Sequence, residues 1–432
     1  MTRMFIKRSS VGALAAASLF LVSCSADSPG EGNADASASD PSAAAATPAV
    51  TTATTEADVS EVRSAQPRLA ISHDGGVMVL EAGDLDDGTA PEVIADLPAE
   101  GYLRLSHAGD GRHVFVSTDD GFAALDMGTH TRAHGDHGHH YAGDPVFTGF
   151  HLAADKPGHV VAGDDSAVFF DDETGDVTTV RLTGMDAVDH FRLPAHHGIA
   201  VLGDDGTYMV TIADDEGSRT GIAQVDADGQ EIERHENCPG AHGAQETAAG
   251  IFVGCSDGGV IYRDGEVTKV TSPDAYGRIG NQAGSAESEY LLGDYKSDAD
   301  AADNGDLERS EQVSIINAET GDLRLVDLGT SYTFRSLAMN DEGLAVVLGT
   351  DGKLHVIDAE SAEVIRTIDV IDEWEESEEW QDPSPALAVS GDVAYVTDPA
   401  TNEVHVVDLT GEHDALTAEL PETPDEILAT EG

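Results

Sequence analysis

The sequence predicts an all-β fold, and three observations lead to that prediction. Short runs of alternating apolar residues recur along the chain between D-G and G-D turns, which is typical of antiparallel strands. No stretch sustains the period of about 3.6 residues that marks an amphipathic helix. A theme of about four strands returns about every 45 residues, and repeats of that length are typical of a β-propeller.

The repeats divide residues 67–432 into about eight predicted blades, with seven as the alternative count. A clear example is Y-L-R-L-S-H-A-G-D-G-R-H-V-F-V-S-T-D-D-G-F-A-A-L-D, which begins at Tyr102. The first unit, from Leu69, lacks an innermost strand, whereas the final D-E-I-L-A-T resembles the strands that open other units. We therefore predict that the C-terminal strand completes the first blade and closes the ring, which also removes an exposed sheet edge.

Residues 1–23 have the pattern of an export signal. Three cations and no acid precede the apolar run Val11–Val22, which is too short to span a membrane. The run leads into L-V-S-C, which resembles a lipobox and predicts cleavage before Cys24 and lipidation of its thiol. An ordinary signal peptide followed by an unrelated cysteine is the alternative. We expect an extracytoplasmic protein that contacts the membrane through its lipid anchor only.

Residues 24–66 are predicted to form a disordered acidic tether between the anchor and the folded domain. The segment is rich in Ala, Ser and Thr and contains no aromatic residue. A chain of this composition buries too little apolar surface to fold by itself.

The chain is strongly acidic, with 82 acidic and 22 basic residues and a formal net charge of −60. Loss of the signal peptide, which contains three cations, would lower the net charge to about −63. This sign excludes nucleic acid as a partner, because binding to a phosphate backbone needs Lys and Arg. The acidity fits the attraction of cations, and it fits adaptation to salt or simple solubility equally well.

Two cysteines, Cys238 and Cys255, remain in the body of the chain once Cys24 is assigned to the anchor. In an exported protein such a pair is expected to form a disulfide. Zinc sites built from cysteine usually show C-x-x-C pairs, which this sequence lacks. We therefore predict a Cys238–Cys255 disulfide across the turn-rich segment between them.

The segment Thr129–Tyr141, T-H-T-R-A-H-G-D-H-G-H-H-Y, is a candidate metal-binding loop. Imidazole is the commonest side-chain metal ligand, and the interleaved glycines would let several rings turn toward one ion. If the segment is extended, His137 and His139 lie on one side and His140 on the other. The candidate ligands are His134, Asp136, His137, His139 and His140. The alternative is a polar loop that binds metal only incidentally.

A second set of candidate ligands lies at the predicted blade starts. Fourteen of the 18 histidines fall between His107 and His242. Blade starts meet at one mouth of a propeller channel, where about four ligands could surround a zinc ion. The candidates are His159 in K-P-G-H-V-V, His196 and His197 in P-A-H-H-G-I-A-V, and His242 in C-P-G-A-H-G. Neighbours in a strand face opposite ways, so at most one of His196 and His197 should point at a given ion. The alternative for each residue alone is a packed or turn histidine.

The sequence shows few patterns that are typical of enzymes. The sequence contains neither G-x-S-x-G nor H-E-x-x-H. G-T-D-G-K-L near Lys353 lacks the spacing of a phosphate loop, and D-A-D-A-A-D-N-G-D-L-E from Asp298 lacks the spacing of a calcium loop. We therefore expect a protein that is not an enzyme.

From about residue 69 to the end, the chain resembles the AztD family of periplasmic zinc metallochaperones. The motifs that carry this resemblance are H-G-D-H-G-H-H, K-P-G-H-V-V, P-A-H-H-G-I-A-V, C-P-G-A-H-G followed by V-G-C, L-L-G-D-Y, D-G-K-L-H-V-I-D, D-P-A-T-N-E-V-H-V-V-D and T-P-D-E-I-L-A-T. The His-His-Gly and Cys-Pro-x-x-His-Gly pieces are the most specific of them. The lipobox with its long tether and the unusual acidity depart from the family pattern.

The resemblance implies a β-propeller that binds Zn²⁺ outside the cytoplasm. It further implies delivery of that zinc to the solute-binding protein of a zinc ABC importer. We also expect a monomer. Two alternatives stay open at this point: an extracytoplasmic propeller hydrolase such as a lactonase, and a non-catalytic propeller scaffold that binds a protein or glycan. Zinc-dependent hydrolysis of simple esters or lactones would favour the first of these, since a catalytic zinc keeps one position open to water.

Overall fold

The computed structural model describes residues 47–432 apart from residues 136, 164, 204 and 264. The predicted signal peptide, Cys24 and residues 24–46 of the predicted tether lie outside the described residues, as does the candidate ligand Asp136. The described part is almost entirely β-structure. Its one helix is α1 (Ala299–Asn304), and no helix in the described residues is long and apolar enough to cross a membrane.

Eight antiparallel sheets follow one another along the chain, as the repeats predicted. The first contains β37 (Ile427–Thr430), β3 (Arg68–His73), β4 (Gly76–Glu81) and β5 (Glu92–Pro98). The second contains β6 (Arg104–His107), β7 (His113–Thr118), β8 (Gly121–Asp126) and β11 (Val146–Ala153). The third contains β12 (Pro157–Ala162), β13 (Ser166–Asp171), β14 (Asp176–Arg181) and β15 (Asp186–Arg192). The fourth contains β16 (Ala200–Leu202), β17 (Tyr208–Ala213), β18 (Arg219–Val225) and β19 (Glu231–His235).

The remaining four sheets repeat this order. The fifth contains β20 (His242–Thr247), β21 (Gly250–Cys255), β22 (Asp257–Arg263) and β23 (Glu266–Thr271), with β24 (Gly277–Arg278) parallel to β22. The sixth contains β25 (Gln282–Gly284), β26 (Tyr290–Asp294), β27 (Gln312–Asn317) and β28 (Leu323–Asp327). The seventh contains β29 (Leu337–Met339), β30 (Leu344–Leu348), β31 (Lys353–Asp358) and β32 (Glu363–Asp369). The eighth contains β33 (Ala386–Ser390), β34 (Val393–Asp398), β35 (Glu403–Asp408) and β36 (Leu416–Glu419).

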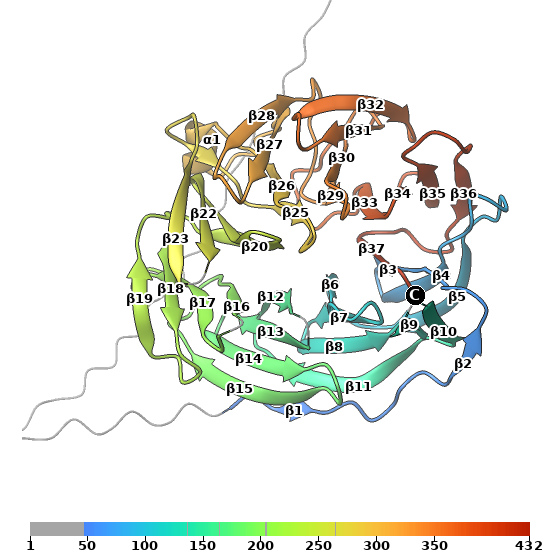
Figure 1. Ribbon diagram of the computed structural model, residues 1–432, viewed down its shortest axis with the longest axis horizontal. Coiled ribbons are helices and arrows are strands. Elements are labelled where there is room, and N and C mark those ends of the chain that lie inside the picture. Colours follow the sequence, from blue (N-terminus) through green and yellow to red (C-terminus); the bar gives the residue numbers. More distant parts are fainter. Residues whose placement is uncertain (1–46, 136, 164, 204, 264) are drawn as a thin grey trace, which may run out of the picture. The chain divides into compact units, whose positions relative to one another are not determined.

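These sheets are the blades of a propeller, and Figure 1 shows them side by side around a centre with the innermost strands turned inward. Alternation along each strand sends neighbouring residues to opposite blades. In β3, Leu69 and Ile71 pack against the eighth blade, whereas Ala70 packs against the second. Eight hydrophobic clusters each join two successive blades in this way, and one of them joins the eighth to the first. Packing of apolar side chains therefore closes the ring.

The C-terminal strand completes the first blade, as predicted. β37 pairs antiparallel with β3, with Arg68 opposite Thr430 and Ile71 opposite Ile427. The start and the end of the propeller are therefore held in one sheet, and β3 has no exposed inner edge.

A ninth, three-stranded sheet is inserted into the second blade between β8 and β11. It contains β9 (Thr129–His134), β10 (His137–Gly143) and β2 (Val59–Val62), with β10 in the middle. A further short strand, β1 (Val50–Thr51), pairs with β11. Part of the predicted tether, residues 47–66, thus pairs with the second blade and its insertion. The exposed edges of β10 and β11 supply backbone hydrogen-bonding groups for it, and valine and threonine suit a strand.

Candidate metal centre

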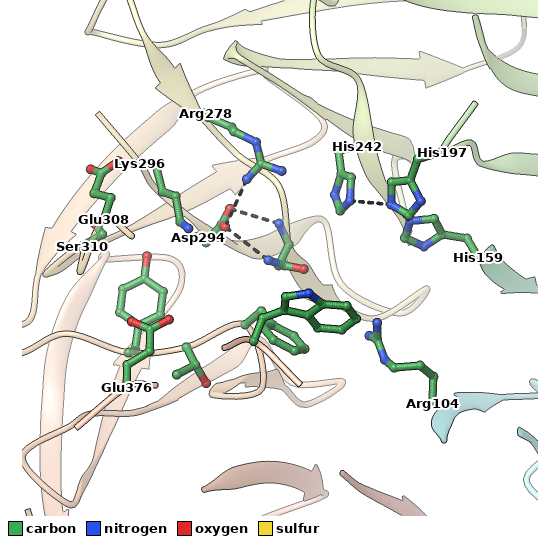
Figure 2. Close-up of a pocket in the computed structure, with 15 residues that line it drawn as sticks. Arg104, His159, His197, His242, Arg278, Asp294, Lys296, Glu308, Ser310 and Glu376 are labelled. Carbon is green, nitrogen blue, oxygen red and sulfur yellow. Dashed lines mark hydrogen bonds and ion pairs between the residues drawn. The ribbon is translucent and has the colours of Figure 1, made fainter. Parts of the chain in front are cut away.

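Three of the predicted ligands, His159, His197 and His242, come together at one end of the inner strands, and we call them the triad. His159 lies on β12, His197 lies in the turn before β16, and His242 is the first residue of β20. These are innermost strands of three successive blades. Blade order alone therefore brings together residues that are far apart in sequence, and Figure 2 shows the three rings facing one another.

The nitrogen spacing in the triad matches a zinc site. The Nε2 atom of His197 lies 3.2 Å from that of His159 and 3.1 Å from that of His242. Ligands in a tetrahedron around zinc, with Zn–N bonds of about 2.0 Å, are about 3.3 Å apart. Two of the three nitrogen pairs therefore have the spacing of such a tetrahedron, and the ligand atoms of all three rings lie within 4.8 Å of one another. Three protein ligands would leave the fourth corner for another ligand.

When the rings of His197 and His242 are both neutral, their tautomers exclude a hydrogen bond between them. The Nδ1–H of His197 donates to Asp172 Oδ2 at 2.6 Å, and the Nδ1–H of His242 donates to the carbonyl oxygen of Gly280 at 2.6 Å. A neutral imidazole of this kind has only a lone pair at Nε2. Two lone pairs that face each other at 3.1 Å repel unless a cation lies between them. This arrangement is what a metal ion would stabilise.

Burial keeps the rings of His159 and His242 in the metal-binding form. Burial lowers the pKa of His159 well below its usual range, and repulsion from the neighbouring rings when they are protonated and from Arg104 adds to the effect. Burial also lowers the pKa of His242, with Arg278 as the next cause. Neutral imidazole binds metals and imidazolium does not, so these rings are ready for a cation at neutral pH.

A cavity of about 370 Å³ opens beside the triad. Arg104, Arg278 and Lys296 bring positive charge to its lining (Figure 2). Trp380 adds an aromatic ring to the lining. The half-buried Glu376 also lines the cavity, and its partial burial raises the pKa of its carboxyl group. All three histidines line the cavity, so it gives a ligand from outside the chain a path to the triad.

His196 does not join the triad, although it was among the candidate ligands. Its side chain is buried, Nδ1 contacts the carbonyl oxygen of Pro194 at 2.7 Å, and Nε2 contacts Thr211 Oγ1 at 2.9 Å. Its ring also packs edge-on against Phe170. His196 therefore anchors the turn from inside, whereas His197 in the same turn faces the triad.

The second group, His134, His137 and His139, lies on β9 and β10, and we call it the hairpin cluster. The sequence predicted a flexible loop here, whereas the structure has a paired β-hairpin that turns at Gly135, whose φ is 64°. His134 lies directly opposite His137, and His139 follows on the same face of β10. Cross-strand neighbours on one face come close, which gives ring centroid distances of 5.1 to 5.5 Å.

The other candidates near the hairpin are placed differently. His140 points to the opposite face, as the period of a strand predicted, and its Nδ1 contacts Thr131 Oγ1 at 2.8 Å. His139 Nδ1 contacts Glu61 Oε1 of β2 at 2.7 Å, so the N-terminal segment reaches the hairpin cluster. Asp136 lies outside the described residues.

The predicted disulfide is present between Cys238 and Cys255, and both residues are fully buried. It ties the segment just before His242 to the end of β21. The bond therefore fixes the approach of the chain to the triad.

Sequence reasoning did not find Asp172, Gly280 or Glu61, which hold Nδ1 atoms of the two groups. Asp172 and Glu61 are two of 82 acidic residues, and Gly280 takes part through its backbone. The identity of an acidic residue or a glycine does not show that it accepts a hydrogen bond from a histidine ring. Only the folded positions of these three residues identify them.

The fold and these two groups of histidines define a β-propeller with two candidate metal sites. The chain is similar to the zinc chaperone AztD of Citrobacter koseri, with 25% identity over 344 residues that cover 75% of this chain and 78% of that protein. It also resembles two structures of Citrobacter koseri AztD, one of them described as apo, with TM-scores of 0.72 and 0.70 at 22% identity. These matches cover 85% of this chain and 99% and 98% of the AztD chains.

The fold is shared with a protein of another kind. Dihydro-heme d1 dehydrogenase NirN in complex with DHE matches with a TM-score of 0.53 and 11% identity, over 87% of this chain and 77% of that one. No protein-family model matches the chain. The predicted resemblance to AztD is thus confirmed, and so is the β-propeller fold.

Proposed function

We propose that the protein is an extracytoplasmic zinc metallochaperone that captures Zn²⁺ with histidine side chains. The observation that carries this proposal is the convergence of three histidines in which Nε2 of His197 lies at tetrahedral spacing from Nε2 of both neighbours. Two of the rings already donate their Nδ1–H groups elsewhere. The similarity to a protein named zinc chaperone supports it. Zinc is the cargo in this role, and no chemical step is required of the protein.

The two groups of histidines have different parts in the proposed function. The hairpin cluster is exposed, so it collects zinc from solution or presents it to a partner. The triad is preset and partly buried, so it holds zinc more tightly. The partner is the solute-binding protein of a zinc ABC importer, which takes the ion by ligand exchange. The protein acts as a monomer.

The proposed location rests on residues 1–66. Residues 1–23 direct export and are removed, Cys24 carries the lipid, and the segment that follows connects the anchor to the propeller. Membrane fractionation with mass spectrometry of the N-terminal peptide tests this part. We expect a lipid-modified Cys24 and release of the Cys24→Ala protein from the membrane. An unmodified wild-type Cys24 would overturn the anchor and leave zinc binding untouched.

Zinc titration of the exported apo protein against a chelator of known affinity tests the central proposal. We expect one tight site and at least one weaker site. Mixing the loaded protein with the apo solute-binding protein should then move zinc to the acceptor faster than zinc leaves the chaperone alone. Absence of a tight site, or transfer no faster than free release, would overturn the metallochaperone role.

A zinc hydrolase is the second candidate, because one observation favours it. Three histidines with an open fourth corner next to a cavity is also the arrangement of catalytic zinc. Assays of the zinc-loaded protein with simple esters and lactones decide between the two. Hydrolysis that disappears in the His197→Ala protein would favour the enzyme.

A further inference from the structure

The three histidines of the triad differ in what holds the second nitrogen of each ring. The Nδ1 atoms of His197 and His242 each have an acceptor at 2.6 Å. Among the described residues, no hydrogen-bond partner lies near Nδ1 of His159. Two rings are thus fixed in orientation and tautomer from behind, whereas the ring of His159 has contacts with the other two rings but no acceptor behind it in the described part of the chain.

The acceptor behind His197 is a buried carboxylate. The Asp172 side chain is 4% exposed, and its other oxygen accepts a hydrogen bond from the backbone N–H of Gly198. The same carboxylate therefore holds the ring of His197 and the turn after it. A carboxylate behind a ligating histidine also makes the far nitrogen a better donor to metal.

The segment that carries His242 is fixed as well. Its acceptor, the Gly280 carbonyl, belongs to a turn whose two N–H groups, from Gly280 and Asn281, donate to the buried Asp294. On the other side, the disulfide at Cys238 lies four residues before the histidine. His242 is therefore held from two sides.

The segment that carries His159 is the least regular of the three. The ladder between β12 and β13 pairs Pro157 with Asp171 and then shifts register before Val160 pairs with Phe169. His159 lies in this irregularity, where regular cross-strand pairing is interrupted. Arg104 lines the same cavity as His159.

We propose that His159 is the exchanging ligand of the triad and that Asp172 is a positioning residue that keeps His197 bound until last. This inference rests on the proposed zinc function. Release begins when the bond from zinc to His159 Nε2 breaks and a ligand of the acceptor takes its place. His197 and His242 hold the ion during this step, because their rings cannot turn away without breaking a hydrogen bond. No proton or electron needs to move.

The test uses the full exported protein with His134, His137 and His139 replaced by alanine, so that the triad is the only cluster left. In this background, His159→Ala, His197→Ala and His242→Ala are compared by zinc titration and by the rate of zinc loss to excess chelator. We expect the loss of affinity to be about tenfold smaller for His159→Ala than for the other two. Equal losses in the three variants would overturn the order of release.

Asp172 is tested with Asp172→Asn and with Asp171→Asn as the matched control. Asp171 is similarly buried but accepts hydrogen bonds from backbone N–H groups, among them those of Asp155 and Lys156, instead of from an imidazole. We expect Asp172→Asn to weaken zinc binding by about tenfold and to speed zinc loss. The thermal unfolding midpoint of its apo form should be no lower than that of the apo Asp171→Asn control. Asp171→Asn should leave zinc affinity unchanged. A fall in the midpoint without a change in zinc affinity would overturn the positioning role.

The two proposals fail in different ways. If the background protein binds no zinc at the triad, the proposed metal function fails there and this inference falls with it. If the background binds one zinc tightly but the single variants are equal, only the inference on exchange is wrong.

Discussion

The triad and the hairpin cluster are made of the same side chain but differ in how much of their geometry exists before a metal arrives. In the triad, Nε2 atoms lie 3.1 and 3.2 Å apart, and Asp172 at 4% exposure holds one ring. In the hairpin cluster, the contact between His134 Nδ1 and His137 Nε2 is 3.5 Å, and Glu61 at 60% exposure holds His139. One site is built into a closed ring, and the other stands on an inserted sheet outside the eight blades.

This difference separates two properties that a metal carrier needs. A preset site loses little conformational entropy on binding, so more of the bond energy appears as affinity. An exposed site on a two-strand hairpin adjusts when the ion binds, so it is weaker but more open to exchange. A carrier that has both can collect at one site and store at the other.

The largest effect is expected from removing the preset site. We expect the double substitution His197→Ala and His242→Ala to lower the affinity of the tightest zinc by more than about 100-fold, because one imidazole cannot hold the ion. The far-ultraviolet circular dichroism should not change, since the eight apolar clusters close the ring without metal. Competitive zinc titration measures the affinity.

The control for this substitution is alanine at His134, His137 and His139. We expect this protein to keep one tight zinc and to lose the weaker site. The comparison between the two sites breaks down if the triple substitution removes the tight zinc and the double substitution does not.

The next effect concerns the disulfide, which supports only the preset site. By the chain-entropy estimate for a loop of this size, replacing Cys238 and Cys255 with alanine should lower the free energy of unfolding by about 3 kcal/mol. Zinc affinity at the triad should fall as well, because the segment before His242 is released. Denaturant unfolding and zinc titration check both points. Unchanged triad affinity in a destabilised protein would show that Gly280 alone fixes His242.

Much of the contrast could be predicted from sequence, and the rest depends on contacts that sequence does not show. The D-G turns and alternating apolar residues predicted blades, and the blade starts placed His159, His197 and His242 together because the repeat itself fixes that position. The glycines at 135 and 138 predicted a flexible loop, yet this segment is a hairpin. The edge of β10 in this hairpin is covered by β2, about 80 residues earlier in the chain, and no local sequence pattern predicts that pairing.

Acidification gives the third test, of the triad alone. Zinc bound by three histidines of ordinary pKa would weaken by about 50-fold between pH 7.5 and 6.0, because protons compete for each ring. Burial lowers the pKa of His159 and His242, so both rings stay neutral at pH 6.0 and protons compete only at lower pH. We therefore expect a loss of less than about tenfold. Zinc titration at the two pH values measures this loss of affinity in the protein with alanine at His134, His137 and His139. A loss of zinc affinity of about 50-fold would show that the rings are not preset in their neutral form.

The smallest effect is expected at the support of the hairpin cluster, and it sharpens the comparison most. Glu61 and Asp172 each accept a hydrogen bond from a histidine Nδ1, at 2.7 and 2.6 Å, so the two contacts differ mainly in exposure. An exposed pair is screened by water and holds its geometry poorly. We expect Glu61→Gln, made in the His197→Ala and His242→Ala background, to weaken the hairpin site by about two- to fivefold only. Asp172→Asn should weaken the triad by about tenfold. Zinc titrations at low and high salt measure both, and the Glu61 effect should shrink with salt while the Asp172 effect should not. Equal effects with equal salt dependence would mean that burial within the propeller adds nothing to the support that a carboxylate gives to a histidine ligand. The distinction between a preset and an adjustable site would then rest on nitrogen spacing alone.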